Sequence, residues 1–309
     1  ARNMMCRNTI QVQTLILGDI AKIKDIKGFI TENQGLQSPD FPNRLMMRFP
    51  QTQPTDKPLS FFASSALSAS TSAKLDIPAD FVPPRYVTAL DIHCMPGGYC
   101  SEVTADDIAV GALYDRGVYL YSMGYTGPDN DDMGRSVCNY LKRNAPGFSP
   151  KRILDMGCTV GHSTLPYKEL FPDAEVWGID VGGPCVRYAH ARAAAMGREV
   201  NFAQMNAEET PFPDGHFDLV VSHILLHETS GKAMPRIFAE GYRVLAPGGM
   251  MIHADLPPFD LMDPFTQFIL DNETWYNNEP FWGAMRDMDQ FALATAAGFD
   301  RSEAQIGRA

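Results

Sequence analysis

Residues 151–161, Lys-Arg-Ile-Leu-Asp-Met-Gly-Cys-Thr-Val-Gly, constrain the fold of this chain more than any other stretch. The apolar run from Arg152 to Met156 predicts a buried strand, and a helix is expected to open near residues 162–164. Gly157 and Gly161 lack a Cβ atom, so the backbone between strand and helix can turn tightly and lie against a bound molecule. The first turn of that helix points unpaired N–H groups at the same place. The stretch therefore predicts a ligand-binding turn at the end of a buried strand.

Polar residues also follow the next two predicted strands. Residues 174–180 predict a second strand ending in Asp180, 25 positions after Asp155. An acid at this place can accept hydrogen bonds from both hydroxyls of a ribose. Residues 200–205 predict a third strand, and the Asn-Ala-Glu that follows it can hold the edge of an adenine. The turn at 157–161 departs from G-x-G-x-x-G, so the pattern argues against a nicotinamide dinucleotide.

Strands and helices alternate after the glycine turn, which predicts a parallel sheet with crossover helices. Further strands are expected at 217–223, 250–254 and 302–306, and helices at 184–196, 233–245 and 285–297. Before the turn, helices are expected at 105–123 and 132–143, and strands at 9–16 and 86–93. The expected fold class is α/β.

Five motifs in this order resemble those of class I S-adenosylmethionine-dependent methyltransferases. They are Asp155–Gly161, Asp180, Asn206–Glu208, Phe217–Ser222 and Arg243–Gly249. Within that group the chain is most similar to the small-molecule, UbiE-like enzymes (methyltransferase type 11), over residues 150–300. The resemblance implies a Rossmann-like, mostly parallel sheet flanked by helices, with S-adenosylmethionine as cofactor. The residues implied to bind it are Asp155, Gly157, Cys158, Thr159, Gly161, Asp180, Val181, Asn206, Ala207, Glu208 and Ser222.

The chain departs from the family in two places. The middle glycine common in the first motif is Thr159 here, and its side chain can narrow the room beside the methionine part of the cofactor. The family's seventh strand, antiparallel to the sixth, has no counterpart before residue 309. Either the sheet is truncated, or a strand from 11–17 or 86–93 fills that edge.

The chain is expected to divide into three parts. Residues 1–77 form an N-terminal extension, atypical for the family, with a proline-rich stretch at 34–58 and a Ser/Ala-rich stretch at 60–72. Residues 78–148 form a lid or cap region. Residues 149–309 form the cofactor-binding domain, which carries an aromatic cap at 257–283.

The methyl group of the implied cofactor is electrophilic without help, so the protein mainly aligns a nucleophile with it and excludes water. A general base helps where the acceptor must lose a proton. Candidates follow the fourth strand, where ligands bind in open α/β sheets: His223, His227 and Glu228. The alternative for His227 is a hydrogen-bonded structural histidine. Although His223 and His227 are four positions apart, the segment is not H-E-x-x-H and begins at a strand end, so no metal is expected.

Aromatic and polar residues outside the motifs are candidates for the acceptor pocket, since such pockets combine apolar walls with a few aimed polar groups. The candidates are Tyr121, Tyr125, Trp275, Tyr276, Asn278, Glu279 and Trp282. The alternative is that they are core or surface aromatics of a helix and a cap.

Composition limits the partners. A net charge of −11 disfavours nucleic acid, which needs a basic face, and points to a small-molecule acceptor. The six cysteines include no C-x-x-C pair, which is typical of reduced thiols and a cytoplasmic location. No run of 18 apolar residues exists, so no membrane span is expected. A homodimer is left open. Competing functions are a cyclase or lyase that uses the same cofactor, or a non-catalytic binder of it.

Overall fold

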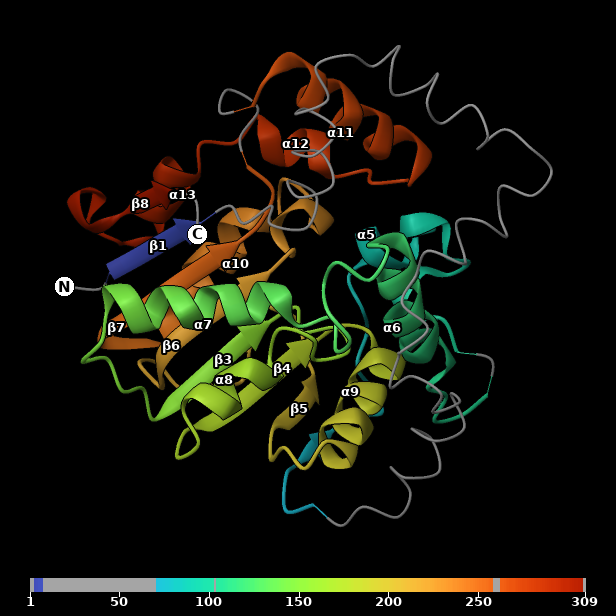
Figure 1. Cartoon of the computed structure of the whole chain (residues 1–309), viewed down its shortest axis with the longest axis horizontal. Helices are drawn as coiled ribbons and strands as arrows, with labels where there is room; N and C mark the ends of the chain where they lie inside the picture. Colours follow the sequence, from blue (N-terminus) through green and yellow to red (C-terminus); the bar gives the residue numbers. More distant parts are fainter. Residues whose placement is uncertain (1–2, 8–70, 103, 258–261, 308–309) are drawn as a thin grey trace.

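An eight-stranded sheet forms the centre of the protein in the computed structural model, which describes residues 3–7, 71–102, 104–257 and 262–307 (Figure 1). All of its strands pair in parallel, in the order β2-β5-β4-β3-β6-β7-β1-β8. The strands are β1 (Asn3–Arg7), β2 (Leu75–Asp76), β3 (Arg152–Met156), β4 (Glu175–Asp180), β5 (Asn201–Gln204), β6 (Phe217–His223), β7 (Leu245–Ala254) and β8 (Gln305–Gly307). The α/β fold expected from the sequence is confirmed.

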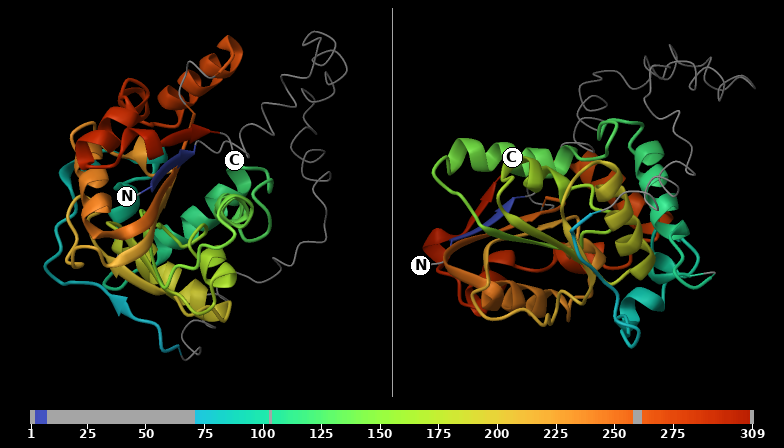
Figure 2. Two further views of the ribbon diagram at one scale, coloured as in Figure 1. Left: turned by 90° about the vertical axis from the view of Figure 1, so that its left-hand side faces the viewer. Right: turned by 90° about the horizontal axis from the view of Figure 1, so that it is seen from below.

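The described residues also form nine α-helices, some of which cover the two faces of the sheet. They are α5 (Arg85–Thr88), α6 (Ala109–Tyr121), α7 (Asp132–Asn144), α8 (Leu165–Leu170), α9 (Gly183–Ala195), α10 (Met234–Val244), α11 (Pro264–Tyr276), α12 (Trp282–Arg286) and α13 (Gln290–Ala297). The right-hand view of Figure 2 shows α7 on one side of the sheet and α10 on the other.

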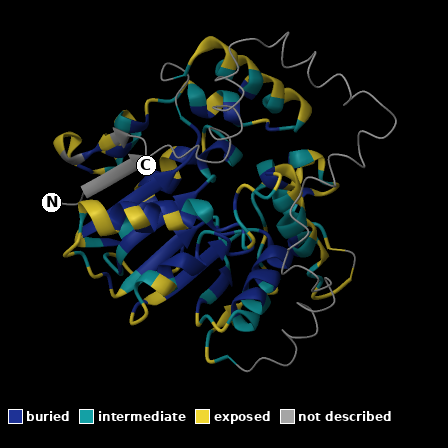
Figure 3. Cartoon of the chain, viewed as in Figure 1, coloured by how far each residue is buried: buried dark blue, intermediate teal, exposed yellow. Residues whose placement is uncertain are grey.

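Alternation along the strands explains the two layers, because successive side chains point to opposite faces of a sheet. In β3, Leu154 and Met156 pack in the same apolar cluster as α10, α12 and α13. Ile153, which precedes them and points to the opposite face, packs with α7, α8 and α9. The central strands are therefore buried on both faces, as Figure 3 shows for β3 and β6.

The N-terminal strand lies inside the sheet. β1 pairs in parallel with β7, from Asn3 opposite Met250 to Arg7 opposite Ala254, and on its other side with β8. A strand from the N-terminal region thus joins the sheet, but neither of the two expected segments supplies it. Residues 9–16 and 11–17 lie outside the described residues. Because β2 also pairs in the sheet, two pieces of the predicted extension belong to it; the three-part division stays a prediction.

Three expected elements differ in the structure. Residues 86–93 form no strand: Pro84 precedes the short helix α5, and Ile92–Cys94 form a 3-10 helix, η2. The helix expected at 285–297 is two helices, because Asp289 caps a new start by accepting the N–H of Ala292. The last strand begins only at Gln305, after a 3-10 turn capped by Asp300.

Short segments and helices gather beyond the carboxyl ends of the strands. Figure 1 shows α5 and α6 there, next to the ends of β3 and β4. Across the described residues, no helix is both long and apolar enough to cross a bilayer.

Candidate active site

The glycine turn after β3 is shaped so that its first residue must be glycine. Gly157 has φ +74°, and its N–H donates to the carbonyl of Ile179 in β4 at 2.8 Å. A Cβ atom there would lie 2.6 Å from Cδ1 of Leu225, so a side chain would force Leu225 to move and would also have to adopt an unfavourable φ. The turn therefore packs closely between β4 and the segment after β6. Because Gly157 has no side chain, its backbone lines the cavities described below.

Thr159 occupies the same turn in a conformation that β-branched residues rarely adopt, with φ +46°. This explains in physical terms why glycine is common at this place in the family that the sequence resembles. The Thr159 N–H donates to Oδ2 of Asp180 at 3.0 Å. The turn after β3 and the acid at the end of β4 are thus joined directly.

Asp180 is a half-buried acceptor at this junction. Its Oδ1 accepts the N–H of Gly182 at 2.8 Å, while its Oδ2 accepts that of Thr159. Burial raises the pKa of the Asp180 carboxyl to about 6, although both backbone donors act in the opposite direction. Each carboxylate oxygen has two lone pairs, so Asp180 can still accept hydrogen bonds from a ligand.

A first cavity, which we call the nucleoside cavity, lies beside Asp180. Its walls are formed by Tyr86, Val87, Ile92, Tyr99, Ile179, Val181, Met205, Asn206, Ala207, Leu225, Glu228, Thr229 and Ile237, together with the residues it shares with the second cavity. An acid beside apolar walls and an amide fits a ribose and an adenine, so the residues present suit S-adenosylmethionine.

The second cavity, the acceptor cavity, encloses about 450 Å³ between α6, the glycine turn and α12. Leu113, Val118 and Tyr121 of α6 and Trp282 of α12 are among its apolar walls. It shares part of its wall with the nucleoside cavity, at Tyr114, Gly157, Thr159, His223 and Ile224. A molecule in one cavity therefore lies directly beside a molecule in the other.

The remaining predicted cofactor residues have different positions. Val181, Asn206 and Ala207 line the nucleoside cavity, and Asp155 and Cys158 line the acceptor cavity. Gly161, Glu208 and Ser222 line neither. Glu208 pairs with Arg236, and the Ser222 hydroxyl bonds to Nδ1 of His253 at 2.7 Å.

His223 is held at both ring nitrogens. Its Nε2 lies 3.0 Å from the hydroxyl of Tyr167, and its Nδ1 lies 3.3 Å from Oδ1 of Asp155. Asp155 in turn accepts the hydroxyl of Thr164 at 2.6 Å. His223 therefore forms a fixed part of the wall between the two cavities.

His227 is held at one nitrogen only. Its Nδ1 lies 2.7 Å from Oδ1 of Asp255, whose Oδ2 accepts the N–H of Leu226 at 2.7 Å. Its Nε2 is directed toward two carboxylates, 3.9 Å from Glu228 and 3.8 Å from Glu279. Burial would lower the pKa of His227, but the carboxylates of Asp255, Glu279 and Glu228 together outweigh it and raise that pKa to about 9.

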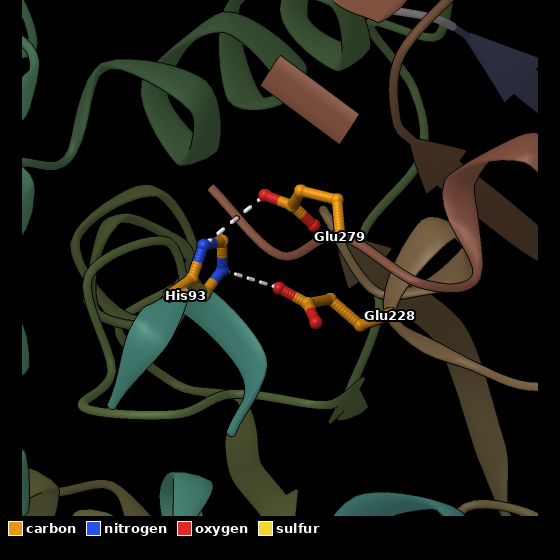
Figure 4. Close-up of side chains that lie close together, drawn as sticks. All are labelled: His93, Glu228 and Glu279. Atoms are coloured by element: carbon orange, nitrogen blue, oxygen red, sulfur yellow. Dashed lines mark hydrogen bonds and ion pairs between the residues drawn. The ribbon is translucent and has the colours of Figure 1, made fainter. Parts of the chain in front are cut away.

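A histidine that sequence reasoning missed lies between the same two carboxylates. His93 Nε2 is 2.6 Å from Oε1 of Glu228, and His93 Nδ1 is 3.1 Å from Oε1 of Glu279 (Figure 4). The hydroxyl of Tyr99 also donates to Glu228, at 2.9 Å. The only signal in the sequence was the Met-Pro-Gly-Gly turn between these two residues, because each lies in a three-residue 3-10 helix, which is too short to show a periodic pattern.

The predicted acceptor residues separate into two groups. Glu279, Trp282 and Tyr121 line the acceptor cavity. The remaining four do not: the side chains of Trp275 and Tyr276 are 84% and 80% exposed on α11, Tyr125 is 52% exposed, and Asn278 donates to the carbonyl of Asp91.

Comparison with known proteins places these features in a family. Residues 153–249 match the family model described as a methyltransferase domain. Demethylmenaquinone methyltransferase of Thermus thermophilus is 41% identical over 110 residues, which are 36% of this chain and 49% of that protein. Ajmaline N-methyltransferase of Rauvolfia serpentina is 34% identical over 120 residues, 37% of this chain and 40% of that protein.

Among solved structures, phosphoethanolamine N-methyltransferase 2 of Haemonchus contortus in complex with S-adenosyl-L-methionine is similar with a TM-score of 0.46 and 21% identity. The match covers 60% of this chain and 42% of that one. The chain spans about half the length of the curated relatives it matches. Residues 153–249 thus match a methyltransferase domain, in agreement with the class I, S-adenosylmethionine-dependent enzymes that the sequence resembles.

Proposed function

We propose that the protein transfers the methyl group of S-adenosylmethionine to a small-molecule acceptor. The observation that carries the proposal is the wall common to the two cavities. A cofactor whose nucleoside half lies beside Asp180 has its sulfonium end near Gly157, Thr159 and His223, where the acceptor cavity begins. An acceptor held there would lie beside the reactive methyl group, in a cavity whose walls limit the access of water.

The acceptor is proposed to be largely apolar with one polar end. Leu113, Val118 and Trp282 give the cavity apolar walls, while His227, Glu279 and His93 place polar groups at one side. The matched relatives are named for a quinone precursor and an alkaloid as acceptors, which agrees with such a cavity. The roles assigned to His223, His227 and Glu228 in the sequence analysis stay predictions.

The experiment that tests the proposal follows both products of the cofactor. The full chain is incubated with S-adenosylmethionine and a panel of hydroxynaphthalenes, aromatic amines and fatty acids. S-adenosylhomocysteine that forms only with an acceptor, together with an acceptor heavier by one methyl group, is the expected result. Methylthioadenosine instead would favour a cyclase or lyase, and absence of both products would favour a non-catalytic binder.

The role of His227 in methyl transfer is tested by a separate variant. His227→Gln keeps a hydrogen-bonding side chain in place but removes the imidazole that Asp255 orients. If His227 acts on the acceptor, kcat falls at least tenfold while the Kd of S-adenosylmethionine stays within about threefold, as a loss confined to the transition state requires. An unchanged kcat would remove His227 from the proposed site.

A further inference from the structure

The cluster of His93, Glu228 and Glu279 has the composition and spacing of a metal site. One ligand atom of each residue lies within 4.8 Å of those of the other two. The three come from separate segments: the 3-10 helix η2, the 3-10 helix η4 (Leu226–Glu228) and the loop before α12 (Figure 4). Two of them, His93 and Glu279, line the acceptor cavity, and Glu228 lines the nucleoside cavity.

The two carboxylates are incompletely satisfied. The Glu279 side chain is 6% exposed and that of Glu228 is 12% exposed. Within the described residues, Oε2 of each is buried without a hydrogen-bond donor. Buried carboxylate oxygens are costly to leave unpaired, so these atoms point to a ligand that is cationic.

The charges lead to the same conclusion. Three carboxylates meet here, those of Glu228, Glu279 and Asp255, and the two imidazoles that face them, His93 and His227, supply at most two positive charges. A divalent ion bound to a neutral His93 beside a protonated His227 would balance the three negative charges, and it would bind carboxylate oxygens that now accept no hydrogen bond from the described residues.

The surroundings orient the three residues as outer groups do in metal sites. The Tyr99 hydroxyl fixes Glu228 at 2.9 Å, and the amide of Asn277 fixes Glu279 at 3.1 Å. If Nε2 of His93 binds an ion, Nδ1 carries the proton and can donate it to Oε1 of Glu279, 3.1 Å away. Such outer hydrogen bonds set the direction of first ligands in metalloproteins.

We propose that His93, Glu228 and Glu279 bind a divalent transition-metal ion at the polar side of the acceptor cavity. Bond lengths of about 2.0–2.2 Å place ligand atoms roughly 3.3–3.6 Å apart. The two carboxylates now face different nitrogens of His93, Glu228 at Nε2 (2.6 Å) and Glu279 at Nδ1 (3.1 Å). An ion on Nε2 therefore requires the separation from Glu228 to widen by about 1 Å and the free Oε2 of Glu279 to turn toward the ion. One imidazole with two carboxylates suits Mn²⁺, Fe²⁺ or Zn²⁺ more than Ca²⁺.

Three protein ligands leave coordination positions free, as in catalytic metal sites. Since His93 and Glu279 line the acceptor cavity, a free position faces it, and Nε2 of His227 lies beside that position. The class of ligand it would take is an oxygen group of the acceptor, such as a hydroxyl or an enolate.

Binding of Mn²⁺ tests the proposal without cofactor or acceptor, so its failure would leave the proposed methyl transfer intact. The full chain is titrated with Mn²⁺, and free ion is counted by electron paramagnetic resonance. The expected result is one ion per chain with a Kd of tens of micromolar or lower. Pulsed spectra of the bound ion should show one imidazole nitrogen, which disappears in His93→Gln.

Glu279→Gln and Glu228→Gln should each weaken binding about a hundredfold or more. The matched control is Glu273→Gln, which changes the same side chain on α11 outside the cluster and should bind as the native chain does. Circular dichroism identifies any variant that fails to fold, and the nitrogen signal of the native chain then decides. Absence of binding at millimolar Mn²⁺, or equal binding by native chain and Glu279→Gln, would overturn the site.

Discussion

At the scale of single residues, Asp180 holds opposing roles in stability and binding. Its pKa is raised to about 6 because the carboxyl is buried. A folded-state pKa above the unfolded value of about 3.9 means that the group stabilises the fold at low pH. That contribution is lost as the pH rises through about 6, so at neutral pH the ionised, half-buried Asp180 costs stability. The same charge is what a ribose needs as an acceptor.

We therefore expect the melting temperature of the cofactor-free native chain to fall more between pH 5 and pH 7.5 than that of Asp180→Asn, which has no titrating carboxyl at this position; the comparison between pH values is used because Asn can accept only one of the two backbone N–H groups. The Kd of S-adenosylmethionine should rise at least tenfold, because hydrogen bonds to a carboxylate contribute about 1.5–3 kcal/mol each. In the native chain that Kd should also rise about tenfold per unit below pH 6, and in the variant it should not. Calorimetry at several pH values measures both effects, and a pH-independent native Kd would contradict this role.

At the scale of elements, the sequence predicted the central parallel strands and missed the site residues that come from short irregular segments. β3, β4 and β6 were located because buried strands and their terminal acids follow one another at regular spacing. His93 and Tyr99 were not, since they reach Glu228 from short 3-10 segments with no periodic pattern. The apolar residues at 86–93 imitate a strand, but Val87 and Ile92 turn inward from α5 and η2 and line the nucleoside cavity.

The position of α6 depends on one close approach. A Cβ atom on Gly111 would lie 2.5 Å from Cβ of Tyr188 in α9, whereas one on Gly117, two turns along, would meet nothing within 4 Å. Gly111→Ala should destabilise the protein by about 1–3 kcal/mol and move α6 away from the acceptor cavity. Gly117→Ala, the matched control, should stabilise it by about 0.5–1 kcal/mol, since alanine favours helix. Urea unfolding compares the two, and equal stabilities would show that this contact does not hold α6.

At the scale of the whole molecule, the sheet joins the two ends of the described chain. β1 lies between β7 and β8, so β8 is attached to the sheet through β1. This arrangement could not be read from the sequence, because a five-residue strand with no distinctive pattern can pair with several edges. It also means that β8, 300 positions further along the chain, is held in the sheet through its pairing with residues 3–7.

Removal of residues 1–7 should therefore expose one edge of β7 and release β8. Amide hydrogen exchange at Met250–Ala254 and Gln305–Gly307 is expected to speed up at least tenfold, because local opening costs less free energy when backbone partners are lost. Exchange at Asn201–Gln204, on the opposite side of the sheet, should stay the same and serves as the internal control. The cofactor should still bind, since Asp180 and the glycine turn lie three strands or more from β1. Unchanged protection of Met250–Ala254 would mean that β1 contributes no pairing to the sheet in solution.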